Sequence, residues 1–288
     1  MQNDHIRNIV AMLSLTCVLV SLPFNRPAWG RSLDEIMKSG VIRICLAGTK
    51  QNFYQKNAMA YVDSLGSGVK PEFTHFEAWD DQFRNNTGEV LRDEAYTPEP
   101  LASGKCDMYP NDLVKVEWRE KKLAYVPLYI SRNTIIVNKT RKEEFKEIKD
   151  LAGKTAAVMK ETSYHTWLDD MNRSAFQENP VKIVFLPQKD AILAVDAGKA
   201  DFSIIGADGA LWSIKSFAGN VSVAFPVGEF TEYGWCFRKA DKDLQEAVAR
   251  FFDQQKKLPD SELNRNWKEN TGITLDDFIM FVSQASKP

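Results

Sequence analysis

A short pattern that occurs twice constrains the fold more than any other feature of the chain. Gly104-Lys105-Cys106-Asp107 precedes one apolar strand-like segment, and Gly198-Lys199-Ala200-Asp201 precedes another. Two such strand starts, each after a helical segment, predict two α/β lobes of similar build. Open α/β sheets bind ligands in crevices at the carboxyl ends of their strands. Arg119, near the start of a predicted helix, can then face a cleft between the lobes, which is typical of a receptor for a small anion or carboxylate.

The N-terminus indicates export. Residues 1–8 carry His5 and Arg7, residues 9–24 are almost uncharged and apolar, and Ala28-Trp29-Gly30 is a small-x-small cleavage site. This order predicts a signal peptide over residues 1–30, a mature start at Arg31 and a periplasmic location. The apolar run of about 16 residues is shorter than the roughly 20 residues of a membrane span. An uncleaved anchor stays an alternative.

Composition argues against several classes of partner and cofactor. The formal net charge of −2 argues against nucleic acid, which requires a basic surface. After signal removal three cysteines stay, Cys45, Cys106 and Cys236, so one disulfide with one free thiol and three buried thiols are both open. His75 and His165 lie far apart, and the cysteine spacings fit no zinc pattern. We therefore expect neither a metal nor a cofactor.

Hydrophobic periodicity predicts alternating helices and strands along the whole mature chain. The predicted strands are 41–46, 69–77, 123–129 with 132–137, 154–159, 181–186, 201–205, and 221–227 leading into 232–239. The predicted helices are 33–39, 54–65, 162–172, 190–197, one from about 207, 244–257 and 261–271. Residues 80–100 are polar and rich in turn residues, so they predict a surface insertion.

A family resemblance follows from phrases that occur in order along the chain. The chain resembles the bacterial extracellular solute-binding proteins of family 3, the periplasmic receptors of polar amino acid transporters. The resemblance implies a type 2 periplasmic-binding fold, with lobe 1 formed by residues 31–130 and 231–288 and lobe 2 by the inserted residues 131–230. Two crossing strands would join the lobes. The matching phrases are 40–44, 101–107, 116–120, 124–129, 148–158, 197–201, 237–241 and a terminal helix near Trp267.

The resemblance also implies how a ligand carboxylate is held. In the family, an arginine placed twelve residues after the strand-opening aspartate binds it, and that spacing from Asp107 leads to Arg119. The planar guanidinium matches a carboxylate with two parallel hydrogen bonds. A surface ion pair of Arg119 with a neighbouring glutamate is the alternative. A second contact in the family comes from a Gly-Thr-Thr turn, where this chain has Thr162 and Ser163 after Glu161.

The chain departs from the family where the ligand amine is held. The usual aspartate position, five residues after Asp201, is Gly206, which has no side chain. Asp208 and Asp112 are the candidates to replace it, and Asp112 can instead pair with Arg119. The first-lobe loop is also altered, with Phe53 and Tyr54 as candidates to cover the ligand or to belong to the core.

We expect the first of three functions, and the other two stay open as alternatives. The first is a monomeric, non-catalytic receptor that closes on a small carboxylate-bearing solute, such as an amino acid, for delivery to a membrane permease of an ABC transporter. The second is a dehydratase-like enzyme on the same scaffold, for which Glu161 is the unusual candidate acid or base. The third is an accessory protein of an exported dehydrogenase, with residues 80–100 as a partner surface.

Overall fold

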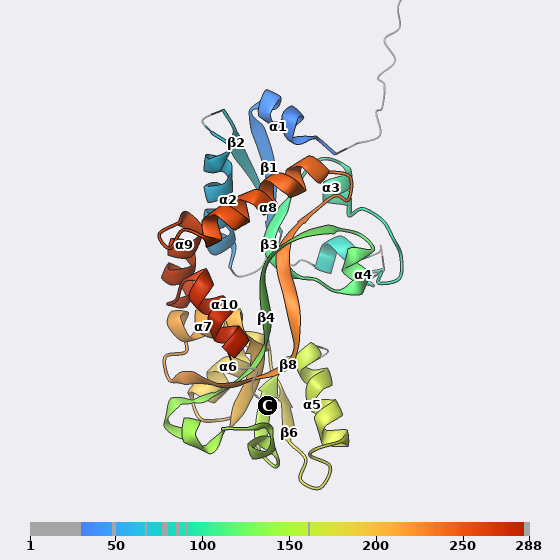
Figure 1. Ribbon diagram of the computed structural model, residues 1–288. Coiled ribbons are helices and arrows are strands. Elements are labelled where there is room, and N and C mark those ends of the chain that lie inside the picture. Colours follow the sequence, from blue (N-terminus) through green and yellow to red (C-terminus); the bar gives the residue numbers. More distant parts are fainter. Residues whose placement is uncertain are drawn as a thin grey trace, which may run out of the picture.

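The computed structural model shows an elongated α/β molecule in which two parts are joined by long strands (Figure 1). The predicted signal, apart from Gly30, and Glu161 lie outside the described residues. The structure describes residues 30–47, 50–66, 68–76, 80–84, 87–89, 91–160 and 162–284.

The first part begins with a helix whose ends are set by local chemistry. Helix α1 (Leu33–Ser39) starts at Ser32, which forms a capping box with Glu35, and ends at Gly40 in the left-handed region. Strand β1 (Val41–Ala47) pairs in parallel with β2 (Lys70–Phe76), and helix α2 (Gln51–Ser64) connects them. These elements match the sequence predictions to within a few residues.

Two long strands run through both parts of the molecule. Strands β4 (Ala124–Asn138) and β8 (Val221–Phe237) pair antiparallel from Ala124↔Phe237 to Asn138↔Val221. At one end, β8 also pairs with β3 (Tyr109–Val114). At the other end, β4 pairs with β7 (Phe202–Gly206). The crossing segments predicted near residues 131 and 230 are therefore extended. These four strands belong to one six-stranded sheet in the order β3-β8-β4-β7, which continues with β5 (Thr155–Val158) and β6 (Lys182–Phe185).

The second part alternates strands and helices around this sheet. Its core lies on both faces, with Phe202 and Ile204 in one buried cluster and Ile205 in another. The remaining elements of this part are β5 (Thr155–Val158), α5 (Ser163–Arg173), β6 (Lys182–Phe185), α6 (Gln188–Asp196) and α7 (Ala207–Ser216), with the short helices η2 (Lys139–Glu144) and η3 (Ile148–Leu151) before them.

Three C-terminal helices pack on the first part and the crossing strands. They are α8 (Lys242–Lys256), α9 (Glu262–Thr271) and α10 (Leu275–Gln284), and the sequence analysis missed the last of them. Phe278 of α10 contacts the ring of Tyr129 at 5.4 Å and that of Trp267 at 5.0 Å between centroids.

The predicted insertion at residues 80–100 is only partly a surface loop. It contains the short helix η1 (Asp80–Phe83), in which Phe83 is fully buried. Helix α3 (Glu99–Ala102) overlaps its end, and Leu101 is also fully buried. The segment therefore contributes core side chains. Helix α4 (Glu117–Glu120) follows β3 and carries Arg119.

The repeated Gly-Lys-x-Asp pattern has one structural meaning at both positions. Gly104 and Gly198 have φ values of 73° and 68°, in the left-handed region that favours glycine. Each following aspartate accepts a backbone N–H from the neighbouring parallel strand. Asp107 accepts from Arg43 at 2.8 Å, and Asp201 accepts from Thr155 at 2.7 Å. The repeat therefore fixes where two strands begin.

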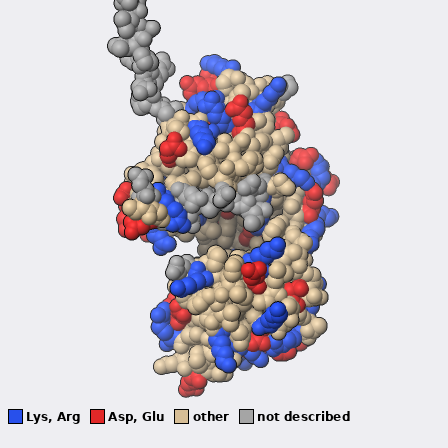
Figure 2. Space-filling model, turned by 180° about the vertical axis from the view of Figure 1, so that it is seen from behind, with Lys and Arg blue, Asp and Glu red and all other residues tan. Residues whose placement is uncertain are grey.

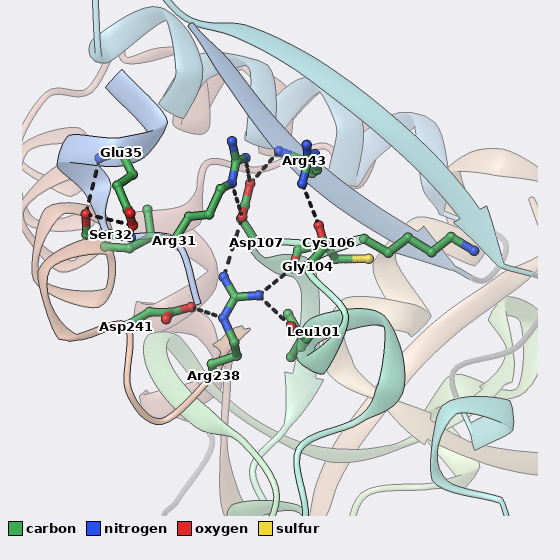
Figure 3. Close-up of polar contacts among 12 residues, drawn as sticks. Arg31, Ser32, Glu35, Arg43, Leu101, Gly104, Cys106, Asp107, Arg238 and Asp241 are labelled. Atoms are coloured by element: carbon green, nitrogen blue, oxygen red, sulfur yellow. Dashed lines mark hydrogen bonds and ion pairs between the residues drawn. The ribbon is translucent and has the colours of Figure 1, made fainter. Parts of the chain in front are cut away.

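Asp107 is the more deeply buried of the two and is the centre of a charged network (Figure 3). Its carboxylate pairs with Arg31 and lies 3.4 Å from Nη2 of Arg238, whose side chain is 5% exposed. Arg238 also donates from Nη1 to the carbonyls of Leu101, at 2.6 Å, and Cys106, at 2.8 Å. The network joins the chain before α1, the first half of β1, the start of β3 and the end of β8.

The cysteines resolve the alternatives left by the sequence. Cys45 and Cys106 form a disulfide with a Cα–Cα separation of 5.7 Å, which joins β1 to the segment before β3. Cys236 is a buried free thiol, and burial raises its pKa far above the ordinary value. The interpretation of one pair plus one free thiol is confirmed.

We expect Asp107→Asn to destabilise the protein by roughly 3–5 kcal/mol, because it leaves a buried arginine without its full charge partner. Urea unfolding measures this loss. Asp34→Asn is the matched control, since Asp34 pairs with Lys38 where both side chains are at least 70% exposed. The control should lose no more than about 0.5 kcal/mol. Equal losses in the two variants would contradict this role for the network.

Candidate functional site

A hollow separates the two parts of the molecule on the face shown in Figure 2. The described side chains that converge at the junction of the two parts come from α2, β3, β4, β8, α5 and α7. Two carboxylates, one lysine and four tyrosines form this group, which we call the junction cluster: Lys50, Tyr54, Asp112, Tyr129, Tyr164, Asp208 and Tyr233.

Asp112 is held in an unusual backbone conformation. The pairing of β3 with β8 shifts register between Tyr109 and Leu113, and Asp112 has φ 49°, the one positive value among the described non-glycine residues. Such irregularities re-aim side chains near binding sites. The Asp112 carboxylate is buried and accepts a hydrogen bond of 3.2 Å from Nε1 of Trp235. The bulge therefore directs a carboxylate inward.

Asp208 lies in the first turn of α7 and binds Lys50, which immediately precedes α2. The distance from Lys50 Nζ to Asp208 Oδ2 is 2.8 Å, and each side chain is 16% exposed. Lys50 and Asp208 belong to different parts of the molecule, so this ion pair bridges the junction. It also shows that the cluster accommodates an ammonium group.

Tyrosines surround the two carboxylates. The rings of Tyr129 and Tyr233 stack at 5.1 Å with an interplanar angle of 7°. Burial raises the pKa of Tyr54, Tyr129 and Tyr233 well above the ordinary value, and the charges of the carboxylates raise it further. All of these hydroxyls are therefore neutral and can donate hydrogen bonds. The Tyr164 hydroxyl accepts a hydrogen bond of 3.3 Å from the backbone N–H of Gly206.

The cluster is short of positive charge. Burial raises the pKa of Asp112 to about 7, and the charge of Asp208 contributes further in the same direction. Lys50 and the hydrogen bond from Trp235 lower the pKa, but they do not compensate for burial. A second cation near Asp112 would favour its ionised form.

Arg119 lies on the first part, near the junction cluster. Its Nη1 donates to the carbonyl of Val114 at 3.1 Å, and its guanidinium lies 5.0 Å from the ring centroid of Trp118 and 5.9 Å from that of Phe83. Burial and the charge of Asp208 raise the pKa of Tyr233, whereas Arg119 lowers it. The positive charge of Arg119 therefore interacts with the cluster through Tyr233.

Thr162 and Ser163 begin helix α5 on the second part. The Thr162 hydroxyl accepts from the backbone N–H of His165 at 3.4 Å and donates to the carbonyl of Met159 at 2.7 Å. Ser163 is exposed. Tyr164, the next residue, contacts Gly206 and so brings this helix terminus toward α7.

Phe53 and Tyr54 have different surroundings. Phe53 is 6% exposed and meets the ring of Trp267 edge-on at 5.6 Å, so it belongs to the hydrophobic core. Tyr54 is partly buried, and the charges of Asp112 and Asp208 raise the pKa of its hydroxyl in addition to burial. Of the two, Tyr54 is the one in the junction cluster.

Sequence reasoning missed several members of the cluster. These members are Lys50, Tyr129, Tyr164 and Tyr233, and Trp235, which donates to Asp112, was missed as well. Tyr129 and Tyr233 lie within the predicted crossing segments. This position could have indicated that they lie at the junction of the two parts. Only the pairing of β4 with β8 brings the two rings together.

The described residues contain no group of three or more His, Cys, Asp or Glu side chains arranged to hold a metal ion. In the same part of the chain, no helix has both the length and the apolar composition needed to cross a membrane.

Solved structures with the same architecture include solute-binding proteins. An ancestral cationic amino acid solute-binding protein is 22% identical with a TM-score of 0.63, and the match covers 83% of this chain and 98% of that one. The L-cystine solute receptor of Neisseria gonorrhoeae, in an unliganded open conformation, is 14% identical with a TM-score of 0.62, covering 84% and 97%. The chain has the solute-binding-protein fold. The predicted type 2 periplasmic-binding fold is thereby confirmed, and these neighbours are of the family 3 type that the sequence resembles.

Sequence comparison finds a match over part of the chain. A curated relative, the membrane-bound lytic murein transglycosylase F of Desulfosudis oleivorans, is 24% identical over 157 residues. The match covers 54% of this chain and 34% of that protein, so the chain spans about a third of its length. No family model matches the chain.

We expect Asp112→Asn to change how stability depends on pH. The folded pKa of about 7 lies above the ordinary 3.8, so the folded state binds more protons between these values and the parent loses stability as pH rises through this window. The loss is at most about 1.4 kcal/mol per pH unit. Urea unfolding from pH 4 to 8 should show a shallower fall for the asparagine variant. Parallel curves would contradict the burial of an ionisable Asp112.

Proposed function

We propose that this protein is a solute receptor that binds a small zwitterion, an amino acid or a related compound, at the junction cluster. The observation that carries the proposal is the placement of Asp112 and Asp208 together in a tyrosine-lined site that already holds one ammonium group, that of Lys50. Among the described residues Asp112 has no ion-pair partner of its own, and a ligand ammonium can supply one. The fold of the neighbours supports a binding role.

Arg119 is the proposed partner of the ligand carboxylate. It is the arginine near the cluster that also has the family spacing from Asp107. Its contacts with Trp118 and Phe83 orient the guanidinium before a ligand arrives. The first turn of α5, with Thr162 and Ser163, is proposed to close on the carboxylate from the second part, since helix N-termini favour anions.

The proposed mechanism is closure of two lobes. We propose that residues 31–130 and 231–288 form one lobe and residues 131–230 the other, with β4 and β8 as the connection. A ligand that contacts both lobes binds the closed form more tightly and shifts the population toward it. The closed receptor would then deliver the solute to a membrane importer. A neighbouring structure concerns glutathione import through GshT and the cystine ABC importer TcyBC of Streptococcus mutans, with 20% identity and a TM-score of 0.57, covering 81% of this chain and 95% of that one.

Location and assembly are part of the same proposal. An exported receptor, released by cleavage near Gly30 and acting as a monomer in the periplasm, fits the predicted signal.

A second candidate function is proton-transfer catalysis at the same cluster. Asp112, with a pKa of about 7, has the property of a general acid or base at neutral pH. One neighbouring structure is described as an ancestral amino acid-binding protein that is a precursor of cyclohexadienyl dehydratase. Recovery of an unchanged solute after prolonged incubation favours the receptor, and its conversion in the parent but not in Asp112→Asn favours the enzyme.

We expect Arg119→Ala to weaken solute binding by roughly 2–5 kcal/mol, because truncating one partner of a desolvated charge pair leaves the other unpaired. This loss is about 30-fold to several thousand-fold in affinity. A thermal-shift screen of amino acids identifies the solute, and isothermal titration measures its affinity.

Arg119→Lys should recover part of the loss, since an ammonium cannot form the two parallel bonds of a guanidinium. Arg173→Ala is the matched control, because Arg173 is 72% exposed and pairs with Asp170 on α5. Unchanged affinity in Arg119→Ala would remove Arg119 from the site.

A further inference from the structure

A second pocket lies beside the Lys50–Asp208 ion pair, on the α6 side of α7. It has a volume of about 300 Å³, at the small end of the range for ligand pockets. Its walls are apolar, and the rings of Trp212 and Phe217 meet edge-on at 5.7 Å within it. The lining residues are Lys50, Gln188, Lys189, Ile192, Ile205, Gly209, Trp212, Ser213 and Phe217.

Three side chains of this pocket, Lys50, Gln188 and Lys189, carry hydrogen-bond donors. Lys50 Nζ lies 5.8 Å from the ring centroid of Trp212, and Lys189 Nζ lies 5.4 Å from that of Phe217. Lys189 has no carboxylate partner among the described residues. Nε2 of Gln188 is buried and, within the same part of the chain, has no hydrogen-bond acceptor. A buried donor without an acceptor is costly, so the pocket is built for a ligand that accepts hydrogen bonds.

We propose that this pocket binds a small monocarboxylate with an aryl or branched alkyl body. The apolar body would lie between Ile192, Ile205 and Trp212, while the carboxylate accepts from Gln188 and meets the charge of Lys189. A body of about one ring fits the volume. This site shares Lys50 with the junction cluster, but its apolar walls come from side chains that the cluster does not include.

The position of Lys50 gives the pocket a link to closure. Lys50 comes from the first part of the molecule, whereas the other lining residues come from α6, the end of β7, α7 and Phe217. The pocket is therefore complete only when the two parts are arranged as in this structure. A molecule bound there stabilises that arrangement, because a ligand shifts a population by its differential affinity for the two states.

The test uses 3-phenylpropionate and its neutral isostere 3-phenylpropanamide as probes, with the full mature protein, by isothermal titration and ligand-observed NMR. We expect the carboxylate to bind roughly tenfold or more tightly than the amide, since hydrogen bonds to a charged group are the stronger ones. Lys189→Glu should weaken 3-phenylpropionate by a similar factor, and Gln188→Leu should weaken it as well.

Lys182→Glu is the matched control, because Lys182 is also exposed and its reversal changes the net charge equally without touching the pocket. It should leave binding unchanged. The proposal would be overturned if 3-phenylpropionate does not bind. It would also be overturned if the parent binds both probes with equal affinity and Lys189→Glu binds 3-phenylpropionate as tightly as the parent does. Loss of 3-phenylpropionate binding in Arg119→Ala would place the probe at the junction cluster and would also overturn it. Failure of amino acid binding alone would leave this site standing.

Discussion

The buried carboxylate of Asp107 is the interaction on which the first part of the structure depends. It holds the backbone of Arg43 and the guanidinium groups of Arg31 and Arg238, so three segments distant in sequence meet at one point. β3 leads from this point to Asp112, and β8 reaches it just after Trp235. The same two strands that the network fixes thus meet again in the hydrogen bond from Trp235 to Asp112. Because the start of β3 is fixed, the position of the bulge that carries Asp112 is fixed as well.

The charge balance of the junction cluster is the reason why we propose that it binds the cationic group of a ligand. Two carboxylates face one ammonium, in surroundings that raise the pKa of Asp112 to about 7. Burial disfavours the ionised form, and a nearby opposite charge restores it. The Lys50–Asp208 ion pair also opposes ligand binding at Asp208. An incoming ammonium that binds Asp208 must share this carboxylate with Lys50 or displace Lys50 from it. Asp112, in contrast, has no ion-pair partner among the described residues.

The sequence predicted what local chemistry determines. Helix 33–39 and the strands that follow Asp107 and Asp201 were predicted, because the capping box at Ser32 and the left-handed turns at Gly104 and Gly198 are encoded within a few residues. Asp112 and Asp208 were candidates from their positions in the chain, and both belong to one electrostatic cluster. Lys50 and the stacked tyrosines were missed because only tertiary pairing assembles them. Helix α10 was missed for a similar reason, since its existence depends on packing against Tyr129 and Trp267.

Proton release on ligand binding tests the central claim most directly. If a ligand ammonium binds beside Asp112, it must ionise a carboxyl whose pKa is about 7, so binding at pH 6 releases a proton. Isothermal titration of the identified solute in buffers of different ionisation enthalpy measures the number of protons released per ligand bound. We predict a release close to one proton per ligand at pH 6, falling toward zero at pH 9 and absent at both pH values in Asp112→Asn. Tight binding at pH 6 without proton release in the parent would contradict the account.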